Sequence, residues 1–158
     1  PQRVNGIAMI CTGPYADPPA AHPKRLAALE AVEQGRYFEM VEQQAANAFH
    51  PDSLANADLM RARSAMVHAY GPQRYAAHVR ATMARPDRSG LLDGSKPTLV
   101  VTASHDSVIP PETVARYAAA IPHVEQHVVP GAGHLLPMER PAELAQLLAD
   151  WITASVSR

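Results

Sequence analysis

The stretch KPTLVVTASHDSVIPPE, residues 96–112, changes character twice along its length. It begins with an apolar run, continues through a polar turn that carries Asp106, and ends with two prolines and Glu112. An apolar run without strict alternation is typical of a buried parallel strand, and proline followed by an acidic residue favours a helix start. The stretch therefore predicts a strand at 97–104 and a helix at 111–121, joined by a rigid loop.

Two other segments share the strand pattern, VNGIAMICT at 4–12 and VEQHVVP at 124–130. The second of these alternates more strongly, so we expect it at an edge of the sheet. A final helix at 140–156 begins with Pro141 and repeats its apolar residues at helical spacing, which predicts that one of its faces is packed. This succession predicts an α/β fold with about three parallel strands and flanking helices.

The segment between the first two predicted strands has a different composition. A proline-rich loop at 13–23 leads into it, and proline excludes regular helix or central strand there. Four Ala-rich stretches with helical spacing follow, at 24–34, 36–48, 54–69 and 72–84. A crossover between parallel strands needs only about a dozen residues. We therefore expect residues 16–95 to form a helical cap, or lid, inserted into a core made of residues 1–15 and 96–158.

The composition of the 158 residues is typical of a soluble globular domain, with 47% hydrophobic and 18% charged residues. The net charge of −1, with Lys and Arg dispersed, provides no basic surface for nucleic acid or an anionic membrane. The single cysteine, Cys11, excludes an intrachain disulfide, and its apolar neighbours favour a buried structural thiol. Because the sequence shows neither a membrane span nor a signal peptide, we expect a cytoplasmic protein.

The loops after the second and third predicted strands carry the candidate catalytic residues, Asp106 and His134. The second of these loops lies in VPGAGHLLPMERPAEL, residues 129–144. Consecutive strands of a right-handed parallel sheet are expected to be neighbours, and functional groups gather in the loops at their carboxyl ends. The two residues should therefore meet on one rim, where a carboxylate holds Nδ1–H of the imidazole while Nε2 takes up a proton.

Each candidate has a simpler interpretation when it is considered alone. A loop aspartate usually caps a turn, and a single loop histidine usually packs or faces solvent. His123 and His127 favour a solvated strand edge over a metal pair, because they are not predicted to share a helix. His105 is interpreted as a surface neighbour of Asp106. The predicted meeting of acid and base is what favours catalysis.

The predicted cap contains two groups of residues with open interpretations. Methionines and tyrosines there either line an acyl pocket or, as we favour, pack a core; they are Met60, Met66, Met83, Tyr70 and Tyr75. Arginines either bind a substrate carboxylate or, as we favour, lie on an exposed helix face; they are Arg61, Arg63, Arg80 and Arg85.

These segments resemble the α/β-hydrolase superfamily. Residues 96–112 are similar to its strand-and-acid segment, P-x-L-x-x-x-G-x-x-D-x-x-x-P, with Ala103 in place of the usual glycine. Residues 129–144 resemble its histidine loop and last helix, and PQRVNGIAMICTGPY at 1–15 resembles the strand that follows its nucleophile helix. The match covers both ends of the chain, and the helical insertion corresponds to the variable cap of the family.

The resemblance implies a partial α/β-hydrolase fold and hydrolysis of a small carboxylic ester or lactone through a serine ester. His134 is then the general base and acid, and Asp106 its orienting partner, with no metal or organic cofactor. Alternatives within the fold are C–C bond or epoxide hydrolysis and cofactor-free haloperoxidase chemistry. An alternative of another class is a non-catalytic, dimerising remnant that acts as an interaction module.

The nucleophile that this resemblance requires is absent from the sequence. The family places it in a G-x-S-x-G elbow, and no serine here has that flanking pattern; the serines are Ser53, Ser64, Ser89, Ser95, Ser104, Ser107, Ser155 and Ser157. We therefore expect the carboxyl-terminal half of a hydrolase, inactive alone. The apolar edge at 4–12 should pair with the missing amino-terminal half or with a second copy of the chain.

Overall fold

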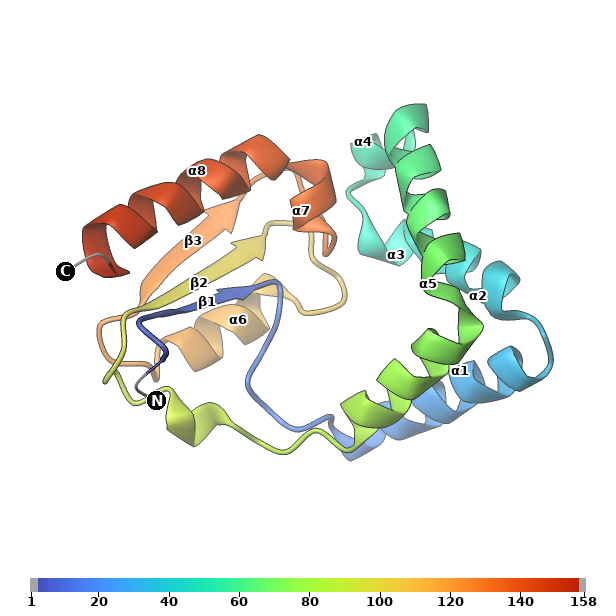
Figure 1. The fold of residues 1–158 in the computed structure, drawn as a ribbon, viewed down its shortest axis with the longest axis horizontal. Helices are drawn as coiled ribbons and strands as arrows, with labels where there is room; N and C mark the ends of the chain where they lie inside the picture. The colour runs from blue at the N-terminus through green and yellow to red at the C-terminus, as the bar shows by residue number, and fades with distance from the viewer. Residues whose placement is uncertain (1–2, 157–158) are drawn as a thin grey trace.

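The computed structural model describes residues 3–156 and is built on a three-stranded parallel sheet in the order β1-β2-β3 (Figure 1). The strands are β1 (Ile7–Ile10), β2 (Thr98–Ala103) and β3 (Glu125–Val129). Each lies where a strand is predicted and is shorter at both ends. The edge position predicted for the third strand is confirmed. The outermost residues of the predicted core, 1–2 and 157–158, lie outside the described residues.

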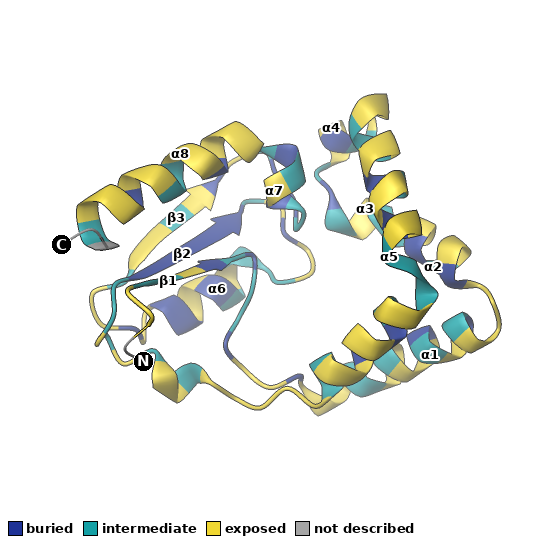
Figure 2. Ribbon diagram, viewed as in Figure 1, coloured by how far each residue is buried: buried dark blue, intermediate teal, exposed yellow. Residues whose placement is uncertain are grey.

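Strand β2 is buried along its whole length, as its unbroken apolar run predicts (Figure 2). Leu99 and Val101 face one side of the sheet, where α8 (Pro141–Trp151) packs, while Val100 faces the side covered by α6 (Pro111–Ala118). The sheet thus has a helix on each face, which is the layered arrangement that parallel strands require.

The residues between β1 and β2, hereafter the insertion, are mostly helical. Its helices are α1 (His22–Glu33), α2 (Tyr37–Gln43), α3 (Ala45–Ala48), α4 (Pro51–Leu54) and α5 (Ala57–Met83), with 3-10 turns η1 (Pro19–Ala21) and η2 (Ser89–Leu91). The first predicted helix is confirmed, whereas the one predicted at 36–48 is divided at Gln44. Most of α4 lies in the gap between the helices predicted at 36–48 and 54–69. His50 caps its start by accepting a hydrogen bond from the Asp52 amide.

Helix α5 is two helical segments that meet at Gly71, where φ is 76° and ψ is 165°. Glycine adopts this conformation without the steric cost of a Cβ, and Pro72 then starts the second segment, where a missing N–H is harmless. The predicted break between helices at 54–69 and 72–84 is therefore confirmed, with the first segment starting later, at Ala57.

The insertion lies beside the sheet and has a small core of its own, formed by Tyr37, Val41 and Val67 (Figure 1). The division of the chain into a core and a cap stays a prediction. Among residues 3–156, no helix has the length and apolarity needed to cross a bilayer.

The loop after β3 contains a short helix that the sequence did not predict, α7 (Leu136–Glu139), directly before α8. Helix α8 continues into the π-helical turn η3 (Ile152–Val156), so the predicted extent of the last helix is confirmed.

Candidate active site

The two predicted site residues meet at the carboxyl ends of β2 and β3. Asp106 follows β2 and His134 follows β3, and these strands are hydrogen-bonded neighbours. Nδ1 of His134 lies 2.9 Å from Oδ2 and 3.1 Å from Oδ1 of Asp106. The geometric prediction from strand adjacency is thus confirmed, and the chemical roles of the two residues stay predictions.

Asp106 is held rigidly and is only 2% exposed. Its Oδ1 accepts hydrogen bonds from the backbone N–H groups of Val108, at 2.9 Å, and Ile109, at 2.8 Å. Burial raises the pKa of the Asp106 carboxyl, but the hydrogen bonds from His134 and from these two amides outweigh burial and leave the pKa below its ordinary value. Asp106 is therefore a carboxylate at neutral pH and an acceptor for imidazole Nδ1–H.

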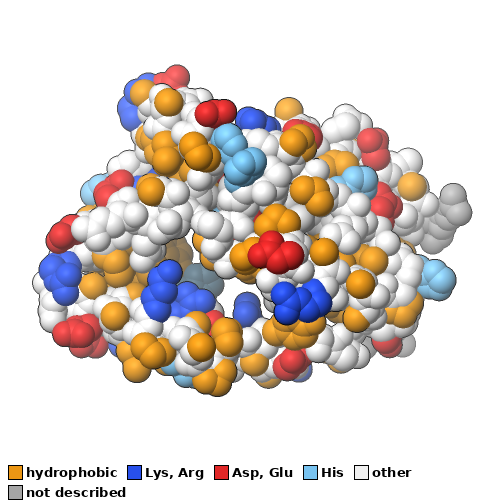
Figure 3. Space-filling view, turned by 180° about the vertical axis from the view of Figure 1, so that it is seen from behind, with side chains coloured by type: hydrophobic (Ala, Val, Ile, Leu, Met, Phe, Trp, Pro, Cys, Tyr) orange, Lys and Arg blue, Asp and Glu red, His pale blue; other side chains and the backbone are white. Residues whose placement is uncertain are grey.

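His134 also lines a cavity of about 240 Å³ between the sheet rim and the insertion. The cavity is lined by Lys24, Arg25, Ala28, Gln44, Asn47, Ala48, Tyr75, Val108 and His134. Because Nδ1 bonds to Asp106, Nε2 is the imidazole nitrogen that this hydrogen bond leaves available. From behind, the surface is hollowed between the sheet and the insertion, with Lys and Arg side chains at its rim (Figure 3).

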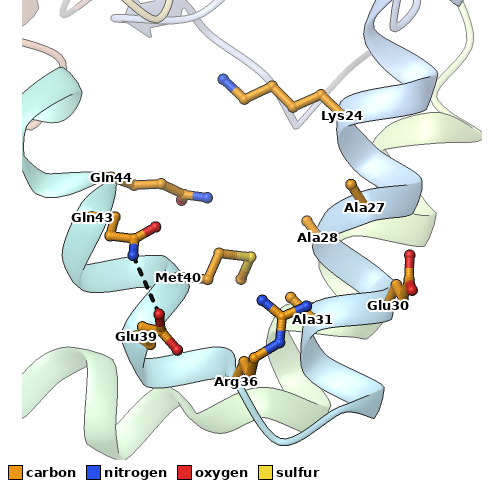
Figure 4. Close-up of a pocket in the computed structure, with 10 residues that line it drawn as sticks. All are labelled: Lys24, Ala27, Ala28, Glu30, Ala31, Arg36, Glu39, Met40, Gln43 and Gln44. Atoms are coloured by element: carbon orange, nitrogen blue, oxygen red, sulfur yellow. Dashed lines mark hydrogen bonds between the residues drawn. The ribbon is translucent and has the colours of Figure 1, made fainter.

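A second cavity, of about 320 Å³, lies between α1 and α2 of the insertion. Figure 4 shows Lys24 and Gln44 extending into it from opposite walls, and both residues also line the cavity at His134. None of the predicted catalytic residues reaches this second cavity. The smaller cavity is therefore the candidate active site, because it contains the imidazole.

Cys11 is a buried structural thiol, as predicted, and lies at the end of β1 beside Asp106. Burial, followed by the charge of Asp106, raises the pKa of the Cys11 thiol from 9.0 to about 12. Since the thiolate is the reactive form of cysteine, the raised pKa favours the unreactive thiol at neutral pH.

His127 and His105 lie at the surface of the protein, as their simpler interpretations predict. His127 lies on exposed β3 and bonds to Glu125 at 2.8 Å. His105 is exposed, and its ring also meets that of His50 from the insertion, edge to face at 4.3 Å. Across the part of the chain that the structure describes, no group of three or more His, Cys, Asp or Glu side chains is arranged to hold a metal.

The interpretation of Arg63 as part of an exposed helix face is wrong, because this side chain is buried. Its guanidinium bonds to Glu42 at 2.6 Å and to the Val41 carbonyl, so it joins α5 to α2. Two acceptors on one neighbouring helix suit the forked donors of arginine. Tyr75, for which core packing was favoured, packs against the core of the insertion and also lines the cavity at His134.

Sequence reasoning missed Glu139, which ends α7 and is 8% exposed. Its carboxylate accepts hydrogen bonds from the Gly133 amide, at 2.7 Å, and from the His50 amide of the insertion, at 2.8 Å. A buried carboxylate needs hydrogen-bond donors, but the sequence alone does not show that a donor 89 positions away comes to lie beside it.

A family model described as alpha/beta hydrolase fold matches residues 16–141. Among solved structures, the malate-bound thermophilic esterase from Thermogutta terrifontis is 28% identical, with a TM-score of 0.89 over 98% of this chain and 58% of that one. The enol-lactonase from Burkholderia xenovorans LB400 is 19% identical, with a TM-score of 0.78 over 96% of this chain and 57% of that one.

Among curated proteins, bifunctional epoxide hydrolase 2 from Sus scrofa is 34% identical over 56 residues, which are 35% of this chain and 10% of that protein. The chain therefore spans less than two thirds of the length of these relatives. The family model covers most of the chain, and its match agrees with the parallel sheet, the flanking helices and the shared folds of the solved structures. The chain belongs to the α/β-hydrolase fold family.

Proposed function

We propose that this chain supplies the general base, His134, and its orienting acid, Asp106, to an enzyme that hydrolyses a carboxylic ester or lactone. The observation that carries the proposal is the 2.9 Å hydrogen bond between these residues at the edge of a cavity. A carboxylate in this position fixes the tautomer of the imidazole and stabilises the imidazolium. Nε2 then removes a proton from the nucleophile and returns it to the leaving alcohol.

The surroundings of the cavity support a carbonyl substrate. Lys24, which comes from the insertion, provides N–H donors suited to an ester oxygen. Most of the residues that line the cavity belong to the insertion, which supports its assignment as a cap over the site. The esterase and the enol-lactonase among the similar structures make ester and lactone cleavage the first choice.

Epoxide hydrolysis is the second candidate, because a curated epoxide hydrolase is 34% identical to part of this chain. The same acid and base serve both reactions, and the nucleophile distinguishes them: a serine for an ester and an aspartate for an epoxide. Comparing turnover of a nitrophenyl ester with that of a styrene oxide separates the two candidates.

We further propose that the nucleophile and the oxyanion-hole donors come from a polypeptide outside residues 1–158. No serine here stands in a G-x-S-x-G elbow. Within residues 3–156, β1 pairs with β2 on one side and with no strand on its other side. An apolar strand with a free edge is a site for strand addition, and an adjoining strand of the nucleophile half suits it.

The test is hydrolysis of a short-chain nitrophenyl ester by the intact protein of which residues 1–158 are proposed to form one part. His134→Ala should lower kcat by at least roughly 10³-fold, because the base is lost, whereas His127→Ala, on the far strand edge, should leave kcat unchanged. Equal activity of the His134→Ala and parent proteins would overturn the proposal. An inert protein that dimerises would instead favour the interaction module.

A further inference from the structure

The backbone on both sides of His134 is tied to one short segment of the insertion. On one side, the Gly133 amide donates to Glu139, whose other oxygen accepts from the His50 amide. On the other side, the Leu135 amide donates to the Ala48 carbonyl at 3.1 Å. The candidate base therefore lies between two anchors that both lead to residues 48–50.

The contact at Gly133 is backbone against backbone. A Cβ at this position would lie 2.7 Å from the carbonyl carbon of Phe49 and 2.8 Å from both the Ala48 oxygen and the His50 nitrogen. Such distances leave no room for a side chain, so the glycine permits this approach. The insertion and the histidine loop are thus in direct contact beside His134.

The same segment also holds the loop of the acid. Ser107, the residue after Asp106, donates its hydroxyl to the Asn47 carbonyl at 2.6 Å. One stretch of the insertion, residues 47–50, hereafter the docking segment, therefore bonds to the loops of both Asp106 and His134. Its position bears directly on the relative position of acid and base.

Glu139 is the side chain that joins the docking segment to the histidine loop. One carboxylate oxygen accepts a hydrogen bond from the histidine loop, and the other accepts one from the docking segment. Within residues 3–156, no Lys, Arg or His forms an ion pair with Glu139. A buried carboxylate without a counter-ion is costly, and here its hydrogen bonds go to two backbone amides. Its arrangement suits it to hold two loops at a fixed separation.

We propose that Glu139 is a positioning residue for the proposed reaction: it fixes His134 relative to Asp106 by joining the histidine loop to the docking segment. The insertion then orients the base as well as covering the cavity. This inference depends on the proposed role of His134. Misplacing a catalytic group by about 1 Å can cost about 10²-fold in rate, so loosening this joint should lower kcat more than it changes KM.

The first test is the Glu139→Gln variant of the intact protein. Glutamine keeps the size of the side chain but replaces one of the two acceptor oxygens with an NH₂ donor, so one of the two hydrogen bonds is lost. We expect kcat for a nitrophenyl ester to fall by about 10- to 100-fold, with KM changed by less than about threefold. The NMR signal of His134 Nδ1–H should shift or broaden. Glu143→Gln, the same change on the exposed start of α8, is the matched control and should alter neither.

A second pair of variants removes the other end of the joint. The backbone of His50 has φ −62° and ψ 144°, and Phe49 before it is extended, so both fit a proline at position 50. His50→Pro replaces the amide hydrogen that Glu139 accepts with a ring carbon, which displaces the Glu139 carboxylate. His50→Ala keeps the amide and removes the same imidazole ring. We expect kcat of His50→Pro to be several-fold below that of His50→Ala.

The outcomes separate the inference from the function on which it depends. If His134→Ala abolishes turnover while folded Glu139→Gln and His50→Pro keep the kcat of their controls, Glu139 only stabilises the fold and the inference is wrong. If Glu139→Gln does not fold, the His50 pair decides by the same comparison. If His134→Ala itself has no effect, the proposed function fails first.

Discussion

Two regions of the sheet differ in how completely this chain supplies their hydrogen-bond partners. One is the rim at the carboxyl ends of β2 and β3, and the other is the free edge of β1. At the rim, Asp106 accepts hydrogen bonds from His134 and from two backbone amides, and both loops are fixed to the insertion. At β1, the described residues pair one side of the strand alone. The chain thus holds a hydrogen-bonded carboxylate–imidazole pair within a sheet whose β1 edge is free to pair with another strand.

The two outer strands differ in polarity. β3 carries Glu125, Gln126 and His127, polar residues that protect a free edge from unwanted pairing. β1 reads IAMI and has no charged residue. Of the two edges, β1 is therefore the one that suits a partner strand, which is the basis of our proposal for the nucleophile half.

The largest expected effect concerns that partner. Residues 1–158 alone should show no ester hydrolysis above buffer, because the nucleophile and the oxyanion-hole donors contribute most of the rate enhancement. Adding the half that carries the elbow should raise the rate by at least roughly 10³-fold. Turnover of a nitrophenyl ester measures both rates. Substantial hydrolysis by residues 1–158 alone would mean that this chain carries its own nucleophile.

The next effect is at Cys11, where the β1 edge meets the rim. With its pKa raised from 9.0 to about 12, the thiol should be roughly 10³-fold less ionised than an exposed cysteine at about pH 8. Labelling with a disulfide reagent should be slow in buffer and fast in concentrated urea. Rapid labelling of the folded protein would show that the rim is open at this point.

At the rim itself, Asp106→Asn should destabilise the fold by about 1.5–3 kcal/mol at neutral pH, because charge-assisted hydrogen bonds are lost. The folded state lowers the pKa of Asp106, so this stabilisation is present above the ordinary carboxyl pKa and disappears as the pH falls through the lowered value.

Urea unfolding of both proteins at neutral and acidic pH checks the expectation. Asp150→Asn is the control, because the Asp150 carboxylate is exposed and bonds locally to Gln146. If the Asp106→Asn and parent proteins differ in free energy of unfolding by the same amount at both pH values, the charge of Asp106 does not stabilise the fold.

The smallest effect is steric. Gly133→Ala should cost about 1–3 kcal/mol, because its Cβ would meet backbone atoms of the docking segment at 2.7–2.8 Å. Gly90→Ala, where nothing lies within 4 Å, should change stability by less than about 0.5 kcal/mol. Thermal unfolding compares the two variants. Equal stability of Gly133→Ala and Gly90→Ala would mean that the docking segment moves to accommodate the added methyl group.

The features that the sequence predicted correctly depend on local patterns. Strand β2 follows from one apolar run, the kink at Gly71 from a glycine–proline pair, and the meeting of Asp106 and His134 from adjacent parallel strands. Each of these predictions requires only residues that are neighbours in the sequence or a general rule of sheet topology.

The features that could not be predicted from the sequence depend on contacts between residues far apart in the chain. Glu139 and His50 are 89 positions apart, and Arg63 finds Glu42 across two helices. Neither contact leaves a periodic signal, because a charged residue on a helix looks the same in sequence whether it faces solvent or a buried acceptor. The role of Glu139 therefore becomes visible only in the structure.

The most direct test of the proposal that His134 activates a serine outside residues 1–158 is covalent labelling of the intact protein with a fluorophosphonate, followed by peptide mass spectrometry. We predict a modified serine outside residues 1–158 and loss of the modification in His134→Ala. Modification of a serine within this chain, or labelling that persists without His134, would overturn the proposed function.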